Sequence, residues 1–218
     1  MIKVFNLYKS YGGISPVLMD ISFDIQGGEF VFLTGHSGAG KTTLFKVLFG
    51  WEKFDRGQIL VGGINVGKLS EKNLYQLRRK VGIVFQDYKL LAKKTVFENV
   101  AFAQQIIGAD NKTVRTKTWN ALKNVGLIKK KDSYPSQLSG GEQQRVSIAR
   151  AIVSDPELIL ADEPTGNLDS EISKEILGLF EKINQQGKTI IIATHSAEIL
   201  RENERRHLLL KRGKLLRS

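Results

Sequence analysis

The stretch Glu29–Gly50, EFVFLTGHSGAGKTTLFKVLFG, joins an apolar run, a glycine-rich loop and a helical pattern. The run EFVFLTG predicts a buried strand, and TTLFKVLFG predicts a helix that stops at Gly50. Between them, GHSGAGKT fits the pattern G-x-x-x-x-G-K-[ST], which binds phosphate where a strand passes into a helix. The alternative is a chance glycine turn before a helix, and the strand and helix on its two sides argue against it.

The residues of this loop suit a polyphosphate ligand. Glycines let backbone N–H groups converge on phosphate oxygens, and the helix N-terminus adds a favourable dipole. We expect Lys41 to reach the β- and γ-phosphates, Thr42 to offer its hydroxyl to Mg²⁺, and Thr43 to face phosphate oxygens. The other residues of the loop expected to bind the ligand are Gly35, His36, Ser37, Gly38, Ala39 and Gly40. The imidazole of His36 is assigned no chemistry.

Three further apolar runs predict the rest of a sheet. They are Val81–Phe85, Glu157–Asp162 and Lys188–His195, and each is apolar on both faces. Such runs are typical of parallel strands that are covered on both sides. Because they alternate with helical patterns, the sequence predicts an α/β fold of the P-loop NTPase kind with a mainly parallel core sheet.

Two other regions depart from this alternation. The N-terminal segment alternates apolar and polar residues and predicts an antiparallel β subdomain. Residues 87–153 predict a helical insertion, in which Thr95 and Glu98 form a capping box before the first helix. The 218 residues, 41% of them hydrophobic, are enough for one domain with a core, which we place over residues 1–218.

Composition narrows the class of protein. Cysteine is absent, which excludes a disulfide framework and a thiolate metal site. The N-terminus has no apolar run of signal-peptide length, and no run approaches the roughly 18 residues of a membrane span. A net charge of +11 favours anionic partners, or reflects a generally basic, solvated surface. The charge gathers at residues 201–218, in an expected terminal hairpin, and at Lys129–Lys131, without interleaved aromatics, so a single-stranded nucleic-acid platform is poorly supported.

An acidic pair ends the apolar run LILADEP. We expect Asp162 to lie beside the phosphate loop and hold Mg²⁺, directly or through water, and Glu163 to orient the attacking water. The alternative for an Asp-Glu pair in isolation is a solvated strand end. The phosphate loop elsewhere in the chain favours the metal interpretation.

Polar residues at other strand ends join this edge of the sheet. Gln86 and His195 each follow an expected buried strand directly, and in open α/β sheets ligands bind at that edge. Gln86 can contact metal or water and report the ligand state to the helical insertion, while His195 can hydrogen-bond the γ-phosphate or the water. Tyr11, before Gly12-Gly13, could stack on adenine, or could be an ordinary hairpin tyrosine.

The stretch LSGGEQQR is a second glycine-rich loop at the start of a helix. Ser139 can cap that helix, and Glu142 completes a capping box. The capping box does not explain Gly140 and Gly141, whose bare backbone would let the helix N-terminus approach a phosphate. The phosphates of the chain's own ligand are already expected at Lys41.

In this order the motifs resemble those of the nucleotide-binding domain of ABC-type ATPases. LSGGEQQR is similar to the family's signature motif, GHSGAGKT and LILADEP to its two nucleotide motifs, and NLD (Asn167–Asp169) to its D-loop. Gln86 and His195 match its Q-loop and switch histidine. The resemblance covers essentially the whole chain.

This resemblance implies an ATPase that uses ATP and Mg²⁺. The catalytic residues it implies are Glu163, His195, Gln86 and Lys41. It implies a head-to-tail homodimer with two ATP molecules at the interface, in which residues Ser139–Glu142 close over the ATP of the other copy. Asp169 would then link the two sites across the interface. It also implies a separate transmembrane, permease-like subunit.

Within that family the chain is most similar to the bacterial cell-division ATP-binding proteins. The stretches TGHSGAGKTTLFK and VFQDYKLLAKKTVFENVAF carry this likeness, as do His36 and Asp87 with the Leu90-Leu91 pair. The likeness implies an FtsX-like membrane partner that docks between about Gln86 and Gln105 and regulates cell-wall hydrolysis. The chain would then be peripheral, on the cytoplasmic side of the inner membrane.

The sequence departs from that group at two places. Thr42 stands where serine is commoner, which keeps the hydroxyl, and Ala92–Lys94 stands where proline and acidic residues are commoner. One alternative is therefore the ATPase subunit of a lipoprotein-release or drug-export transporter. Another is a soluble ABC protein that acts on nucleic acid. Such proteins usually carry two nucleotide domains or a long coiled-coil insertion, and this chain has neither.

Overall fold

Two sheets and six α-helices make up the computed structural model, which describes residues 1–12, 15–196, 199 and 204–216. The antiparallel sheet has the order β2-β1-β4-β5, with β1 (Ile2–Tyr11), β2 (Ser15–Ile25), β4 (Arg56–Val61) and β5 (Ile64–Asn65). The larger sheet has the order β10-β9-β3-β8-β7-β6, with β3 (Phe30–Thr34), β6 (Val81–Val84), β7 (Leu158–Asp162), β8 (Thr189–Thr194), β9 (Arg206–Lys211) and β10 (Lys214–Leu216).

The region that joins β6 to β7 contributes three of the helices, and the other three follow other strands. The helices are α1 (Lys41–Leu48), α2 (Leu74–Lys80), α3 (Val96–Ile106), α4 (Asn111–Asn124), α5 (Gly140–Ile152) and α6 (Ser170–Gln185). Short 3₁₀ turns connect them at Val66–Lys68, Glu71–Asn73, Ile128–Lys130 and Pro135–Gln137. All the expected strands and helices are present, so the predicted α/β P-loop class with its antiparallel N-terminal sheet is confirmed.

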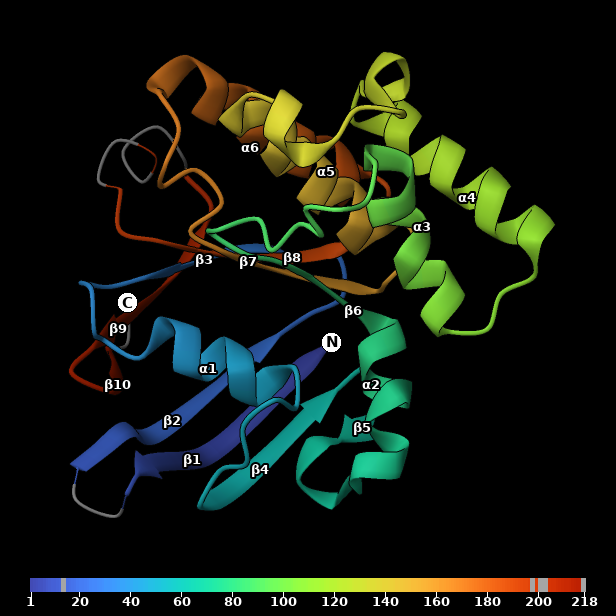
Figure 1. The fold of residues 1–218 in the computed structure, drawn as a ribbon. Coiled ribbons are helices and arrows are strands. Elements are labelled where there is room, and N and C mark those ends of the chain that lie inside the picture. The colour runs from blue at the N-terminus through green and yellow to red at the C-terminus, as the bar shows by residue number, and fades with distance from the viewer. Residues whose placement is uncertain (13–14, 197–198, 200–203, 217–218) are drawn as a thin grey trace.

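The larger sheet lies between two layers. Helix α1 and the antiparallel sheet cover one face, and α5 and α6 cover the other (Figure 1). Strand β3 shows how one apolar run serves both: Val31 and Leu33 belong to the core on the α1 side, and Phe30 and Phe32 to the core under α5 and α6. Continuous apolar runs are therefore what this sheet requires.

Strands β3, β6, β7, β8 and β9 run parallel, and β10 returns antiparallel to β9 at the edge. Their carboxyl ends therefore lie along one edge of the sheet. This edge carries the loop after β3, the acids Asp162 and Glu163 at the end of β7, and the residue after β8. Strand order thus gathers residues that are far apart in the sequence.

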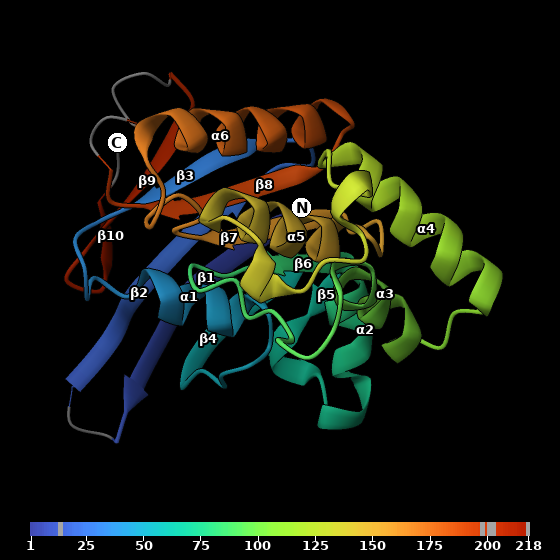
Figure 2. The ribbon, with the colours of Figure 1, turned by 45° about the horizontal axis from the view of Figure 1, so that its top comes forward.

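The region between β6 and β7 forms a helical layer in which α3, α4 and α5 pack together (Figure 2). The predicted capping box of α3 is present, because Thr95 Oγ1 accepts from the N–H of Glu98 and Glu98 Oε2 accepts from the N–H of Thr95. Asn99 is fully buried one turn into this helix. Its Nδ2 donates to the carbonyl oxygens of Leu91 (3.1 Å) and Lys94 (2.9 Å), and its Oδ1 accepts from the N–H of Leu91 (2.7 Å). One side chain therefore fixes the segment that leads from Gln86 into α3.

The expected terminal hairpin is β9–β10, and it has a further role that the sequence pattern does not reveal. The N–H of Gly213, in its turn, donates to Ala39 O in the phosphate loop (3.2 Å), and Gly213 O accepts from the N–H of Met19 in β2 (2.7 Å). Gly213 has φ 75°, and a Cβ there would lie 2.5 Å from Val17 O. The hairpin turn thus braces the phosphate loop from behind.

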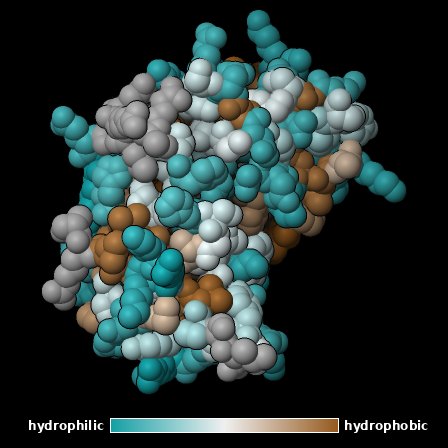
Figure 3. Space-filling model, turned by 90° about the vertical axis from the view of Figure 1, so that its left-hand side faces the viewer, coloured by the Kyte–Doolittle hydropathy of each residue, from teal (hydrophilic) through white to brown (hydrophobic). Residues whose placement is uncertain are grey.

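The face of the molecule that lies at the left of Figure 1 carries both hydrophilic and hydrophobic residues. Hydrophilic residues predominate and hydrophobic ones form separate groups among them (Figure 3). Within the described residues, no helix has the length and apolar character needed to cross a membrane.

Replacing Asn99 by alanine tests the role of this side chain. Asn99→Ala leaves the N–H of Leu91 and two loop carbonyls without their partner, and we expect it to lower the free energy of unfolding by about 1–3 kcal/mol. Urea denaturation followed by circular dichroism measures this. The control is Asn120→Ala, at an exposed position of α4, which should be neutral or slightly stabilising. Equal stability of the two variants would contradict the assignment.

Candidate active site

The glycine-rich loop runs from the end of β3 to the start of α1 at Lys41. Gly40 precedes the helix with φ 108°, a conformation that favours glycine. At Gly35 a Cβ would lie only 2.2 Å from Leu210 O of β9, so the loop backbone packs directly on the neighbouring strand. The loop therefore has the shape that a phosphate cradle needs, and it is held there by the sheet.

Lys41 is the cation at the centre of the site. Its ammonium is buried, donates to Gly35 O (2.7 Å) and His36 O (3.3 Å), and lies 3.3 Å from Glu163 Oε1. A buried charge needs such partners. These contacts confine the ammonium to the space between the loop and the acids that end β7.

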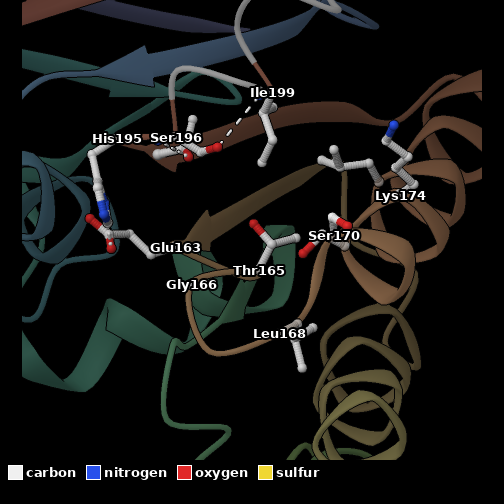
Figure 4. Close-up of a pocket in the computed structure, with 12 residues that line it drawn as sticks. Glu163, Thr165, Gly166, Leu168, Ser170, Lys174, His195, Ser196 and Ile199 are labelled. Atoms are coloured by element: carbon white, nitrogen blue, oxygen red, sulfur yellow. Dashed lines mark hydrogen bonds and ion pairs between the residues drawn. The ribbon is translucent and has the colours of Figure 1, made fainter.

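Glu163 links Lys41 to His195. Its Oε2 lies 2.9 Å from His195 Nδ1, and the two side chains point toward one another at one end of a cavity (Figure 4). The backbone of Glu163 has φ 47°, uncommon for a residue with a side chain, and its N–H donates to Ala193 O of β8 (3.0 Å). Strained backbone of this kind is often found at functional sites. The carboxylate is therefore oriented by the main chain and contacted by Lys41 at one oxygen and by His195 at the other.

Asp162 lies at the end of β7 beside Thr42. Burial raises the pKa of its carboxyl above the ordinary value, the hydrogen bond from Thr42 and the charge of Lys41 oppose this, and the charge of Glu163 adds to it. Its Oδ1 is buried and has no hydrogen-bond partner among the described residues. A carboxylate oxygen without a partner next to a hydroxyl suits a hard cation such as Mg²⁺. These two residues therefore fit the metal role that the sequence predicts.

Gln86, two residues after the end of β6, lies beside the loop that follows Glu163. Its Nε2 is 3.2 Å from where a Cβ of Gly166 would sit, and its carbonyl accepts from Asn167 Nδ2 (3.5 Å). The same position of Gly166 is 3.6 Å from Glu163 Oε2. The structure thus brings Gln86 into the neighbourhood of the acids, as its place after β6 predicts.

Tyr11 lies at the end of β1, next to Gly12. Its ring is 43% exposed, and the ammonium of Lys9 lies 4.7 Å from the ring centroid. An exposed aromatic face at the hairpin end is compatible with stacking on a base. Adenine stacking at Tyr11 stays a prediction.

Ser139–Glu142, which we call the signature segment, begins α5. Ser139 caps the helix and Glu142 completes the capping box, as predicted. The two glycines have a local explanation that the sequence analysis did not find: a Cβ on Gly141 would lie 2.7 Å from Ile172 Cγ2, and one on Gly140 would lie 3.2 Å from the Tyr88 hydroxyl. Close packing within the chain thus accounts for part of the glycine requirement.

The cavity beyond Glu163 and His195 has a volume of about 240 Å³ (Figure 4). It lies between the loop after β7, the end of β8 and helix α6. Among its polar lining residues are Thr165, Ser170, Ser173, Lys174 and Ser196, which sequence reasoning did not assign to the site. Asp169, expected to link two sites across an interface, caps α6 in this structure by accepting from the N–H of Ile172 (2.9 Å).

A second hollow of about 820 Å³, which we call the groove, is lined from α2, β6, α3 and the end of α5. Its exposed apolar side chains are Trp51, Tyr75, Phe102 and Ile106. The basic residues that line it are Arg78, Arg79, Lys89 and Arg150. Glu71 is the one acidic residue in the lining. The groove therefore offers an apolar floor within a positively charged rim.

Known proteins are similar in sequence to this chain along its whole length. Residues 18–166 match the family model for ABC transporters. The cell division ATP-binding protein FtsE of Streptococcus pneumoniae (serotype 2, strain D39) is 45% identical over all of this chain and 95% of that protein. FtsE of Bacillus subtilis (strain 168) is 45% identical over all of this chain and 96% of that protein, and FtsE of Escherichia coli (strain K12) is 45% identical over 99% and 97%.

Solved structures agree with this. A dimeric post-hydrolysis state of the ATP-binding cassette MJ0796, bound to ADP and Pi, has a TM-score of 0.88 at 35% identity and covers all of this chain and 97% of that one. CbiO1 of Clostridium perfringens, part of the ABC transporter complex cbiONQ, has a TM-score of 0.90 at 33% identity over 99% and 86% of the chains. With the family model matched over most of the chain and relatives 45% identical along its whole length, the chain belongs to the ABC transporter family of ATPases.

Proposed function

We propose that the chain is the ATP-binding and hydrolysing subunit of a bacterial cell-division complex of the FtsE type. In this complex it couples ATP to an FtsX-like transmembrane partner that regulates cell-wall hydrolysis. The observation that carries the catalytic part is the row Lys41–Glu163–His195 at the carboxyl edge of the sheet. The similarity to FtsE proteins along the whole chain supports the cell-division part.

Nucleotide binding is assigned to the loop and the residues around it. Backbone N–H groups of the loop receive the phosphates, and the ammonium of Lys41 moves from Glu163 to the phosphate oxygens, which leaves Glu163 Oε1 to accept from water. Mg²⁺, when bound, would neutralise charge on the phosphates. Thr42 and Asp162 would hold it, with Gln86 nearby.

Hydrolysis is assigned to Glu163. The carboxylate positions a water in line with the γ-phosphate, and His195 Nδ1, 2.9 Å from Oε2, keeps the carboxylate oriented. Positioning and electrostatic stabilisation are what phosphoryl transfer requires of a protein. The lysine and the loop donors face the oxygens where charge builds up.

A second copy of the chain completes each site. The signature segment of one copy closes over the ATP of the other, and its helix N-terminus supplies N–H donors and a favourable dipole. Within the described part of the chain, the hydrogen bonds of Ser139 lie inside its own helix start, and the ion pair of Glu142 is with Lys130 (3.4 Å). None of these contacts is with the chain's own Lys41 or its phosphate loop.

The groove is the surface we assign to the membrane partner. It lies between the core and the helical layer, next to the segment from Gln86 to Gln105, and it exposes aromatic and aliphatic side chains. A partner held there would keep the chain peripheral, at the cytoplasmic side of the membrane.

Glu163→Gln tests the catalytic assignment. Because a neutral amide cannot orient and polarise the attacking water as the carboxylate does, we expect turnover to fall roughly 10²–10⁴-fold while ATP binding is retained. The variant should also accumulate as an ATP-bound dimer in size-exclusion chromatography. Phosphate release measures turnover, and Glu171→Gln, an exposed acid in the first turn of α6, is the control. Unimpaired hydrolysis by Glu163→Gln would sink the assignment.

Mixing two inactive variants tests action in trans. Lys41→Ala removes the phosphate-binding cation and Ser139→Arg blocks the signature segment, so each variant by itself should turn over ATP roughly 10²–10³-fold more slowly. The mixture should regain activity, because the Ser139→Arg copy holds ATP and the Lys41→Ala copy closes over it. A mixture no more active than its components would count against the composite site.

Ile106→Asp tests the groove. Ile106, on α3, lines the groove and is 67% exposed, and a carboxylate there would remove the apolar contact that a partner makes. We expect at least a tenfold loss of co-purification with the FtsX-like subunit from solubilised membranes, as about 1.4 kcal/mol or more of lost burial implies. The matched control is Trp119→Asp, an exposed apolar residue of α4 outside the groove lining. Equal recovery of the partner with both variants would place the docking surface elsewhere.

A further inference from the structure

A strained turn follows Gln86. Tyr88 has φ 55° and Lys89 has φ 49°, so two consecutive residues with side chains adopt the left-handed conformation. This backbone conformation is energetically unfavourable for a residue with a side chain, and it persists only where surrounding contacts hold it. The contacts that hold this turn therefore decide the course of the chain between Gln86 and α3.

Arg150, near the end of α5, makes those contacts. Its Nη1 donates to Lys89 O (2.6 Å) and its Nη2 donates to Tyr88 O (2.6 Å). The planar guanidinium fork thus grips both left-handed residues by their carbonyls. Burial lowers the pKa of this guanidinium from its ordinary value, although it stays protonated, and no described carboxylate forms an ion pair with it. The hydrogen bonds to the two carbonyls compensate the guanidinium for the contact with water that it loses on burial.

The same turn also reaches the other end of α5. The Tyr88 hydroxyl lies 3.2 Å from where a Cβ of Gly140 would sit, at the start of the signature segment. Gly140 and Arg150 are ten residues apart, about 15 Å along a helix. Arg150 is hydrogen-bonded to the turn at one end of α5, and the Tyr88 hydroxyl packs near Gly140 at the other end, so the turn contacts both ends of one helix.

We propose that Arg150 is a positioning residue that clamps the Tyr88–Lys89 turn and thereby keeps the signature segment in register with Gln86. Displacing the clamp lets the Tyr88 ring move away from Gly140, which loosens the segment that closes over ATP in the other copy. The meaning of that closure rests on the proposed function, whereas the link between the two segments belongs to a single chain.

The clamp is also accessible to whatever occupies the groove. Lys89 and Arg150 both line it. A partner segment bound there would touch the clamp and bias its position, so partner binding and signature geometry would be coupled through Arg150.

Hydrogen exchange of the isolated chain without nucleotide tests the link. We expect Arg150→Met to speed exchange severalfold in peptides covering residues 86–90 and in those covering 139–143, with Arg150→Lys intermediate because it offers no fork. Arg145→Met is the matched control: it is on the same helix and also donates to a carbonyl, Val125 O (3.3 Å), but does not reach the turn. It should leave both regions unchanged.

Three outcomes of this experiment would overturn the proposal. In the first, exchange in Arg150→Met rises at 86–90 and stays at the wild-type rate at 139–143. In the second, Arg145→Met speeds both regions as much as Arg150→Met does. In the third, Tyr88→Ala, which keeps Arg150 and removes the ring against Gly140, leaves exchange at 139–143 unchanged.

The mixed dimer gives a second readout. Arg150→Met is placed either in the Lys41→Ala copy, which supplies the working signature segment, or in the Ser139→Arg copy, which holds ATP. We expect about a tenfold loss of the recovered activity in the first arrangement, as loss of hydrogen bonds from a charged group predicts, and a smaller loss in the second. A larger loss in the second arrangement would overturn the proposal. If the mixture of Lys41→Ala and Ser139→Arg without Arg150→Met is inactive, this counts against the proposed function. The hydrogen-exchange experiment would then still test whether Arg150 holds the turn.

Discussion

The buried ammonium of Lys41 is the group around which the site is arranged. A cation withdrawn from water must be compensated, and here two loop carbonyls and the carboxylate of Glu163 compensate it. The loop belongs to the end of β3 and the carboxylate to the end of β7, with β8 between them. The ion pair is therefore satisfied only when three parallel strands end at the same edge in this order. That order also brings His195, at the end of β8, to the second carboxylate oxygen of Glu163.

Much of this arrangement could be predicted from local sequence, and the reasons differ between elements. The strands are predictable because each has apolar residues for both cores, as Val31 and Phe32 do on either side of β3. The starts of α3 and α5 are predictable because their capping boxes are local. The pairing of β9 with β3 and the bond from Gly213 to the phosphate loop are not, because they join residues at opposite ends of the chain.

The candidate site also combines residues that the sequence predicts with contacts that it does not. Asp162, Glu163, Gln86 and His195 are predictable from their place at strand ends, since topology alone brings them together. The packing of Gly141 on Ile172 is not predictable, and without it the paired glycines could be interpreted only as an approach to phosphate. The role of Arg150 is not predictable from the sequence for a related reason. Its partners are main-chain carbonyls 61 and 62 positions away, and a carbonyl carries no sequence signal.

Helix α5 connects the signature segment to the turn after Gln86. It carries the signature segment at its start and Arg150 near its end, and its middle is packed into the core through Val146, Ile148 and Ala149. The close packing of its middle makes that part of the helix resist deformation. The turn after Gln86 is different. The left-handed backbone of its two residues is energetically unfavourable, so the turn keeps this conformation only through the contacts that hold it. In a joint between a rigid helix and a strained turn, the turn is the part that yields. Ligand at Gln86 or a partner in the groove would therefore act on the turn first, and Tyr88 would convey the result to Gly140 and the signature segment.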